Sequence, residues 1–242
     1  MQRIKAVVEF DGSGYCGWQY QENDKTIQGE IERALQVVFK DRIGITGAGR
    51  TDAGVHARNQ VFHADIPDYS LYKLKNSLNG LLNADIVIKH IERCSDNFHA
   101  RFDAVKRRYR YYISEIPTAL ARSFSWHIVF PVNITLMQAG ASLICAYNDF
   151  KSFCKSGSDV NNYHCQIFES RWIKQNGLMI YEICANRFLY GMVRAIVGTL
   201  IDLGRGKITL NEMNEIILSK DRTKVLNSAP AKGLILEEIS YK

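Results

Sequence analysis

The sequence is poor in features that would divide it or place it in a membrane, with only four prolines among 242 residues and no low-complexity linker. Independent domains are usually joined by such linkers, so their absence argues against separately folding modules. A membrane-spanning helix needs roughly 18 or more consecutive apolar residues, and Gly191 and Arg194 interrupt the longest apolar run. The first residues enter a strand pattern with no apolar signal core, so we expect a cytoplasmic protein with no membrane partner.

Cysteine and histidine are present but nowhere clustered. The six cysteines contain no C-x-x-C pair, and the six histidines never fall at the spacing of metal ligands. We therefore expect reduced thiols, several of them buried, and no metal site. Phosphate-binding loops are also missing, because Gly47, Gly49 and Gly54 do not form G-x-G-x-x-G and no Gly-Lys-Ser/Thr occurs. This pattern argues against the dinucleotide and P-loop enzyme classes.

What is there is the composition of a globular protein, with 46% hydrophobic and 23% charged residues. Thirty-one basic residues against 25 acidic ones give a formal net charge of +6. This modest excess favours a polyanionic partner only weakly, so the local distribution of charge carries more information than its sum.

Hydrophobic periodicity predicts strands and helices throughout the chain. The predicted strands are 3–10, 43–48, 59–66, 85–92, 105–114, 168–175, 178–185 and 233–241. The predicted helices are 27–39, 71–81, 135–146, 188–203 and 210–218. The pair Asn176-Gly177 between two strand patterns is a strong signal for an antiparallel hairpin. We expect an α+β protein with a mainly antiparallel sheet flanked by helices, in two similar, intimately packed lobes of residues 1–115 and 116–242.

The most informative stretch is Gly-Ala-Gly-Arg-Thr-Asp-Ala-Gly-Val-His-Ala at residues 47–57. It places one carboxylate, Asp52, in a loop that is too rich in glycine for a helix and too polar for the core. Arg50 lies two residues before Asp52, and His56 lies four residues after it. A lone loop aspartate is usually an N-cap or a turn residue, so a functional interpretation needs support from elsewhere in the chain.

The basic, aromatic run KRRYRYY at residues 106–112 is predicted to be extended. Alternate residues of a strand share a face, so each face combines cations with aromatic rings. One face carries Arg107, Tyr109 and Tyr111, and the other carries Arg108, Arg110 and Tyr112. Such a surface binds phosphates by charge and bases by stacking, at about 1–3 kcal/mol per stacked base. The alternative is an amphipathic edge strand whose arginines are simply solvated.

Arg194 lies within FLYGMVRAIVGTLI at residues 188–201, where apolar residues surround it on nearly every side of the predicted helix. A helix that is apolar all round is expected to be buried. A buried guanidinium is costly unless a carboxylate neutralises it, so Arg194 needs an acidic partner. Asp52 is the candidate that would make the pair functional. A structural ion pair with a glutamate, or extension of the side chain to the surface, remains open.

The loop DGSGYCGWQ at residues 11–19 combines glycines with aromatic residues. This composition suits a flexible contact loop, but it equally suits an ordinary connection between strands. The signal is weak by itself.

Together these segments resemble the tRNA pseudouridine synthase A family through nearly the whole chain. The matching segments are EFDGSGYCGWQ (9–19), TIQGEIERAL (26–35), GAGRTDAGVHA (47–57), FHARFDA (98–104), RRYRYYI (107–113), NDFKSF (148–153), NRFLYGMVRAIVGTL (186–200) and GLILEEISY (233–241). Segments 115–135 and 155–165 match poorly. Tyr190 and Gly191 stand where many members carry histidine or another polar residue, so some RNA contacts are expected to differ.

The resemblance implies an isomerase that converts uridine to pseudouridine at positions 38, 39 and 40, in the anticodon stem-loop of tRNAs, after flipping the base out of the stack. It also implies a homodimer with the pseudouridine synthase fold, an active-site cleft between lobes, and neither metal nor organic cofactor. By match of motifs, Asp52 is the catalytic aspartate and Arg194 pairs with it. Arg50 fills the space of the displaced nucleotide, Tyr109 stacks on the target base and Leu234 lines the uracil pocket. From their charge, Arg107, Arg108 and Arg110 are expected to bind the RNA backbone.

This reaction breaks a C–N glycosidic bond, turns the base and forms a C–C bond, so it is redox-neutral and needs no dinucleotide. One carboxylate can act as nucleophile or can stabilise an oxocarbenium-like sugar, and whether it attacks ribose or uracil stays open. A guanidinium beside it would keep it ionised. Two other classes remain as alternatives: a non-catalytic RNA-binding protein that uses the arginine–tyrosine strand, and a phosphate-loop enzyme. The second would need a divalent ion and another acidic ligand near the glycine loop, for which the sequence offers no obvious pair.

Overall fold

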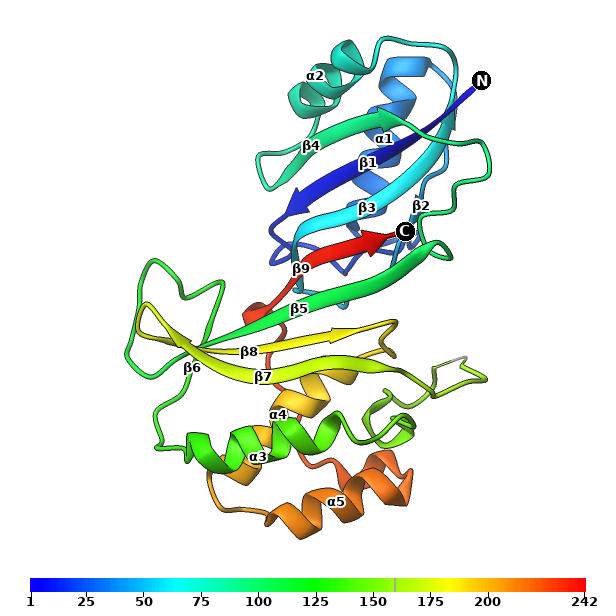
Figure 1. Cartoon of the computed structure of the whole chain (residues 1–242). Helices are drawn as coiled ribbons and strands as arrows, with labels where there is room; N and C mark the ends of the chain where they lie inside the picture. Colours follow the sequence, from blue (N-terminus) through cyan, green and yellow to red (C-terminus); the bar gives the residue numbers. More distant parts are fainter. Residues whose placement is uncertain (159) are drawn as a thin grey trace. The chain divides into compact units, whose positions relative to one another are not determined.

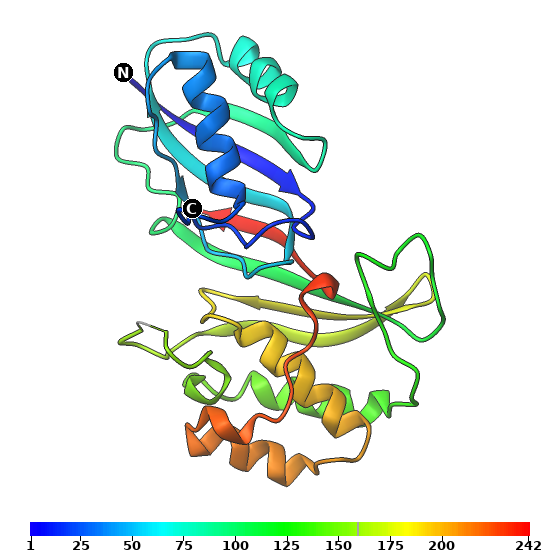
Figure 2. The ribbon, with the colours of Figure 1, turned by 180° about the vertical axis from the view of Figure 1, so that it is seen from behind.

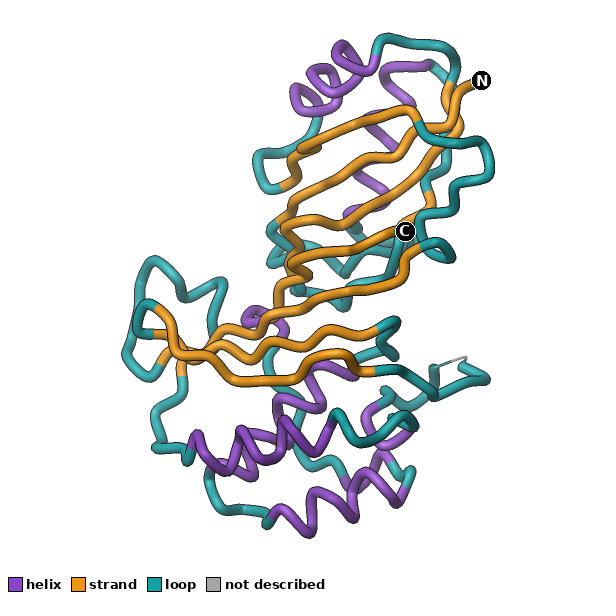
Figure 3. Tube along the Cα trace, in the orientation of Figure 1, coloured by secondary structure: helices purple, strands orange, loops and turns teal. Residues whose placement is uncertain are grey.

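The structure is a computed structural model that describes residues 1–158 and 160–242. Its strands are β1 (Gln2–Phe10), β2 (Thr46–Gly47), β3 (His56–Ile66), β4 (Ile86–Arg93), β5 (Ala104–Ser114), β6 (Trp126–His127), β7 (Ile167–Gln175), β8 (Leu178–Ala185) and β9 (Leu234–Tyr241). Its α-helices are α1 (Ile27–Phe39), α2 (Leu71–Leu81), α3 (Ile134–Ile144), α4 (Met192–Gly204) and α5 (Leu210–Ser219). The predicted α+β class is confirmed, and Figure 3 shows how strands and helices are distributed along the chain. Residue 159, in the poorly matching segment 155–165, lies outside the described residues.

The chain forms two compact units, and the first of them is discontinuous in sequence. The first unit contains Met1–Val105 and Leu236–Lys242, and the second contains Lys106–Ile235. The chain therefore leaves the first unit within β5 and returns to it within β9 (Figure 1). These bounds differ from the expected lobes 1–115 and 116–242. The last strand belongs with the first unit because the side chain of Asn59 donates to the carbonyl oxygen of Glu237 at 2.7 Å.

In the first unit, the strands lie in the order β4-β1-β3-β9, with β2 beside β3. β1 pairs antiparallel with both β3 and β4, and its residues alternate between buried and more exposed. Figure 2 shows α1 lying across one face of these strands. The helix begins after Thr26, whose side chain accepts a hydrogen bond from the Gly29 amide, as an N-cap should. Its buried residues are Ile27, Ile31, Ala34 and Leu35.

The strand predicted at 43–48 is much shorter, because β2 contains only Thr46 and Gly47. Helix α1 satisfies the preceding backbone in place of a neighbouring strand. The amide of Ile45 donates to Glu32 at 3.0 Å, and its carbonyl oxygen accepts from Gln28 at 3.3 Å. After Gly47 the chain enters the loop that contains Asp52, and β3 begins earlier than predicted, at His56.

In the second unit, β8 lies between β5 and β7 and pairs antiparallel with both. The predicted hairpin is confirmed, since Asn176 and Gly177 both have positive φ, of 51° and 75°, as a tight two-residue turn requires. The short β6 pairs in parallel with the end of β5. Figure 1 shows α3, α4 and α5 together on one side of these strands.

Helix α4 is buried as predicted, but it begins at Met192, four residues after the predicted start at 188. The helix cannot begin before Gly191, because the φ of this residue, +70°, is a left-handed conformation that favours glycine and is not helical. Every residue of α4 is buried except Arg194. The described part of the chain contains no helix with the length and apolar character needed to cross a membrane.

Candidate active site

The loop that carries Asp52 is held by a second loop of the first unit. We call residues 48–55 the Asp52 loop and residues 11–20 the supporting loop. The amide of Trp18 donates to the carbonyl oxygen of Thr51 at 3.2 Å, and the amide of Gly54 donates to that of Tyr15 at 3.3 Å. Two backbone contacts therefore fix the Asp52 loop on either side of its carboxylate.

Two glycines of the supporting loop allow this close approach. Gly17 has a φ of +91°, and a Cβ atom there would lie 2.5 Å from the carbonyl oxygen of Thr51 and 3.1 Å from the carbonyl carbon of Asp52. At Gly12, a Cβ would lie 2.0 Å from the carbonyl oxygen of Val55. A side chain at either position would displace the Asp52 loop. The segment 11–19 was only a weak signal in the sequence. In the structure its backbone packs directly against the Asp52 loop and fixes the shape of that loop.

Asp52 itself is half-buried, and it precedes a turn rather than a helix. Its carbonyl oxygen accepts from the amide of Val55 at 3.2 Å, which closes that turn. The turn interpretation therefore explains its backbone, whereas the N-cap interpretation does not apply, because the chain continues into β3.

The two loops are also tied to the sheet of the first unit. The ring nitrogen Nδ1 of His56 accepts from the amide of Gly12 at 3.1 Å, and it lies 3.0 Å from a carboxylate oxygen of Asp11. Burial acts to raise the pKa of Asp11, but its hydrogen bonds with Ser13 and the nearby His56 outweigh it and hold this pKa below its ordinary value. His56 is 2% exposed, so the histidine of the motif has a structural position behind the loop.

Arg50 lies two residues before Asp52 in the same loop. It is exposed, and its Nε donates to the side-chain oxygen of Gln19 at 3.1 Å. The amide oxygen of Gln19 orients the guanidinium without neutralising it. Arg50 therefore offers a positive charge within the Asp52 loop.

In the second unit, β5 presents Tyr109 half-buried, with Phe188 packed edge-on against it. The ring centroids are 5.2 Å apart and the ring planes meet at 88°. This geometry is favourable for two aromatic rings, and it restricts the orientation of Tyr109. Tyr111, two residues further along the same face, is fully buried and so cannot join a binding surface.

The segment that leads into β9 joins the elements carrying Tyr109, Arg194 and Leu234. Nε of Arg194 donates to the carbonyl oxygen of Ala229 at 2.8 Å. The Tyr111 hydroxyl donates to the carbonyl oxygen of Pro230 at 2.7 Å. Burial raises the pKa of Tyr111 above its ordinary range, which keeps it a donor.

A glycine completes this arrangement. At Gly233, a Cβ would lie 2.7 Å from the ring of Tyr111, so the chain passes directly over that ring before it reaches Leu234. Leu234 is buried, at 5% exposure. Sequence reasoning missed the anchoring roles of Tyr111 and Gly233, although their positions next to Tyr109 and Leu234 were the available signal.

The remaining predicted residues are arginines of β5, and carboxylates or carbonyl groups already contact them. Arg107 donates to the carbonyl oxygen of Asn186 at 2.6 Å. Arg108 contacts Glu169 at 2.5 Å and Glu182 at 3.1 Å, and Arg110 contacts Glu182 at 2.7 Å. Their binding of RNA stays a prediction.

Glu182 is the centre of this ionic cluster. Its carboxylate is only 1% exposed, and Arg171 of β7 also approaches it, at 2.6 Å. Burial acts to raise the pKa of Glu182, but hydrogen bonds from Arg110 and Arg171 and the charge of Arg108 hold it below its ordinary value. Sequence reasoning missed this residue, which is the single acidic position in the strand pattern LMIYEICA.

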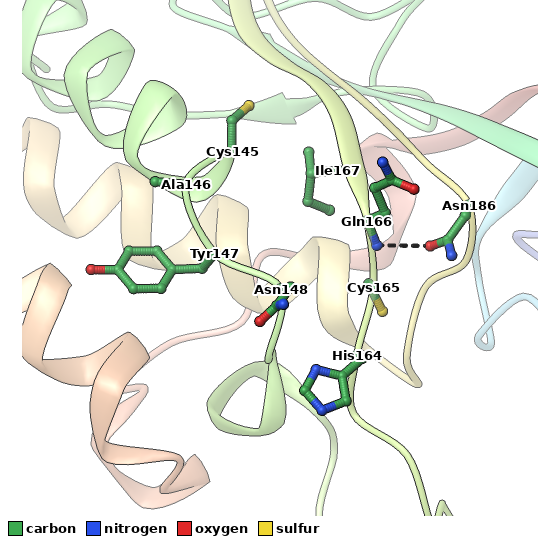
Figure 4. A pocket seen from close by; sticks show the side chains of 9 residues that line it. All are labelled: Cys145, Ala146, Tyr147, Asn148, His164, Cys165, Gln166, Ile167 and Asn186. Atoms are coloured by element: carbon green, nitrogen blue, oxygen red, sulfur yellow. Dashed lines mark hydrogen bonds between the residues drawn. The ribbon is translucent and has the colours of Figure 1, made fainter.

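The second unit also has an open hollow of about 620 Å³, shown in Figure 4. The residues described as lining it are Cys145, Ala146, Tyr147, Asn148, His164, Cys165, Gln166, Ile167 and Asn186. The amide of Gln166 donates to the side-chain oxygen of Asn186 at 2.8 Å across it. None of the predicted site residues is in this lining, so the hollow does not coincide with the candidate active site.

Comparison with known proteins gives matches over the full chain. The family model described as tRNA pseudouridine synthase matches residues 6–103 and 147–242. The tRNA pseudouridine synthase A of Azobacteroides pseudotrichonymphae is 39% identical over 242 residues, covering 100% of this chain and 97% of the relative. That of Thermoanaerobacter sp. strain X514 is 41% identical, with 100% of both chains covered. That of Bacillus subtilis strain 168 is 38% identical, with 99% of both chains covered.

Proposed function

Because the chain belongs to the tRNA pseudouridine synthase family, we propose that this isomerase converts uridine to pseudouridine at positions 38, 39 and 40, in the anticodon stem-loop of tRNAs. We propose further that it works in the cytoplasm as a homodimer. The observation that supports the proposal most is the close packing of the Asp52 loop. Two glycines without room for a Cβ fix the backbone around one half-buried carboxylate. Structural turns do not need such exact support, whereas a reacting group does.

Asp52 is the proposed catalytic residue. It acts on the sugar or on the uracil ring during breakage of the C–N bond, either as nucleophile or as stabiliser of the developing positive charge. Arg194 is the proposed partner that keeps it ionised. Arg194 is half-buried in a helix that is otherwise buried, and it stands in the first turn. A positive charge in the first turn of a helix is unfavourable and favours a nearby anion, which supports this role.

The other proposed roles concern the displaced nucleotide. Taking a base out of the stack costs a few kcal/mol, so groups that fill the gap or hold the base assist the reaction. The exposed guanidinium of Arg50 suits the first task, and Tyr109, whose ring Phe188 orients, suits the second. Buried Leu234 provides an apolar wall for the uracil. Arg107, Arg108 and Arg110 are proposed to contact RNA phosphates.

The decisive test replaces Asp52 with asparagine, which keeps the shape of the side chain and removes its charge. We expect Asp52→Asn to bind tRNA with nearly unchanged affinity and to form pseudouridine at least about 1,000-fold more slowly. Chemical mapping of pseudouridine in tRNA incubated with each protein would measure both the rate and the positions modified.

The matched control is Asp68→Asn, because Asp68 is an exposed aspartate of the same unit outside both loops. It should modify tRNA at the rate of the unaltered protein. Full turnover by Asp52→Asn would remove the catalytic assignment. If the unaltered protein bound tRNA and modified no uridine, the non-catalytic RNA-binding alternative would replace the proposal.

A further inference from the structure

The connection between β8 and α4 carries an exposed aromatic ring among residues of the candidate active site. Tyr190 is 46% exposed. Two residues before it, Phe188 packs against Tyr109, and four residues after it, Arg194 stands in the first turn of α4. Leu189, between them, is buried and holds the connection against the core of the second unit. Tyr190 therefore stands in a short segment between a residue that packs on Tyr109 and the turn that carries Arg194, and its side chain is partly in solvent.

The side chain of Lys155 contacts this ring. Its Nζ lies 4.7 Å from the ring centroid and 3.1 Å from the hydroxyl of Tyr190. The position combines a cation–π contact with a hydrogen bond to the hydroxyl oxygen, so the ammonium group lies at one side of the ring. Lys155 itself is exposed, and its charge is available to a ligand.

The backbone fixes the pair before any ligand arrives. The amide of Lys155 donates to the carbonyl oxygen of Tyr190 at 2.8 Å. Next to it, Gly191 has a φ of +70°, and a Cβ there would lie 3.5 Å from that of Lys155. Because both backbones are already joined, a ligand would have to order little beyond the end of the lysine side chain.

We propose that Lys155 and Tyr190 form a binding site for an RNA nucleotide that neighbours the displaced uridine, an inference that rests on the proposed function. Lys155 contacts a phosphate of that nucleotide, and the open face of Tyr190 stacks on its base. An aromatic ring beside a cation is the arrangement that single-stranded RNA favours. The nucleotide is placed next to the target because the same short segment of chain carries Phe188, which packs on Tyr109, and leads directly into the turn of α4 that carries Arg194.

The alternative is a surface pair that contributes only to local stability. Exposed cation–π contacts contribute about 0.5–1 kcal/mol, so such a pair could exist without a ligand. The two possibilities differ in what they predict for tRNA affinity. The experiment therefore measures affinity and turnover separately.

The first variants are Tyr190→Ala and Tyr190→Phe. Loss of one stacked base should weaken tRNA binding by roughly 5- to 100-fold in Tyr190→Ala. At saturating tRNA, its turnover should remain within about threefold of the unaltered protein, because the nucleotide positions the substrate and takes no part in the reaction. Tyr190→Phe retains the ring, so its affinity should stay within about threefold. Circular dichroism melting would verify that both variants fold.

The third variant, Lys155→Ala, tests the phosphate contact. The slope of log affinity against log salt concentration should fall by about 0.7, the value for one single-strand phosphate contact. The control is the double variant Lys151→Ala with Tyr163→Ala. These two residues form another cation–aromatic pair of the second unit, with a distance of 5.6 Å, but they lie outside the β8–α4 connection. Their loss should leave affinity within about twofold.

Three outcomes would overturn the inference: unchanged affinity in Tyr190→Ala and Lys155→Ala, equal weakening in the control, or weakening accompanied by a change of oligomeric state in light scattering. The last result would identify the pair as a contact between subunits. Failure of the proposed function is distinguishable from all three. If the unaltered protein modified no tRNA but the variants still weakened binding as expected, the nucleotide site would stand without the reaction.

Discussion

The Asp52 loop of the first unit and the arginines of the second are held in place in opposite ways. Backbone hydrogen bonds and the close approach of two glycines position the loop. In the second unit, Arg108 and Arg110 are positioned through their charges, by the buried carboxylate of Glu182. One arrangement is steric and the other is electrostatic.

The two arrangements are sensitive to different kinds of substitution. The close backbone packing of the first region is disrupted when atoms are added, even at a glycine. An electrostatic cluster fails when a charge is removed, even when the shape of the residue is kept. Substitutions that add atoms to the first region, or remove charge from the second, should therefore test the comparison most directly.

The largest effect is expected from Gly17→Ala in the supporting loop. The added Cβ would overlap the carbonyl oxygen of Thr51, and alanine is unfavourable at a φ of +91°. We expect the free energy of unfolding to fall by about 2–4 kcal/mol. We also expect turnover on tRNA to fall about 100-fold, because the Asp52 loop would shift. Urea unfolding and a pseudouridine assay would measure the two losses.

Gly14→Ala is the matched control within the same loop. A Cβ there would meet nothing within 4 Å, and Gly14 has no positive φ. Both stability and turnover should remain close to those of the unaltered protein. Equal losses in the two variants would mean that any glycine of the loop matters, and that the close contact of Gly17 with Thr51 has no special effect.

The next effect is expected from Glu182→Gln, which keeps the shape of the side chain and removes its charge. Three guanidiniums would then surround a neutral amide, at a cost of about 1–3 kcal/mol, moderated by the partial exposure of the arginines. Asn and Gln substitutions at exposed sites lack this effect, so Glu215→Gln on α5 is the control.

The same variant makes a prediction about pH. The folded-state pKa of Glu182 is below its ordinary value of 4.5, so its contribution to stability is present above that pH and disappears as the pH falls through the lowered pKa. The stability difference between the unaltered protein and Glu182→Gln should therefore shrink in acid. Urea unfolding between about pH 7 and pH 3 would measure it. A constant difference over this range would contradict the ionic origin.

The smallest effect is expected in the salt dependence of tRNA affinity, which we compare between variants of two arginines. Arg50 has the neutral Gln19 as its partner, whereas Arg110 contacts the carboxylate of Glu182. Arg50→Ala should lower the slope of log affinity against log salt by about 0.7–0.9, the value for one phosphate contact. Arg110→Ala should lower it less, because Glu182 already offsets its charge. Equal slopes would show that the cluster does not attenuate Arg110.

The sequence predicted most elements because their determinants are local. Helix 27–39 agrees with α1 at both ends, since Thr26 caps it and its apolar spacing is regular. The Asn176-Gly177 turn was equally clear, because both residues adopt the positive φ that this dipeptide favours. The buried character of α4 also followed from local pattern, since twelve of its thirteen residues are buried.

What the sequence could not predict depends on contacts between distant residues. Gly17 gains its role from Thr51, 34 positions away, and no local pattern distinguishes it from Gly14. Glu182 looked like one polar residue in an apolar strand until β5 and β7 brought arginines to it. The shortened β2 has the same cause, because side chains of α1 satisfy Ile45 in place of a strand.

The return of residues 236–242 to the first unit has a consequence for biosynthesis. A ribosome finishes the Asp52 loop and the strands around it long before it makes β9, the neighbour of β3. Until then the part of β3 that β2 does not cover carries unsatisfied backbone donors and acceptors along one edge. Such an edge is a template for association between nascent chains. Emergence of the last strand thus closes the earliest-made part of the molecule, and newly made protein would be most vulnerable to aggregation in that interval.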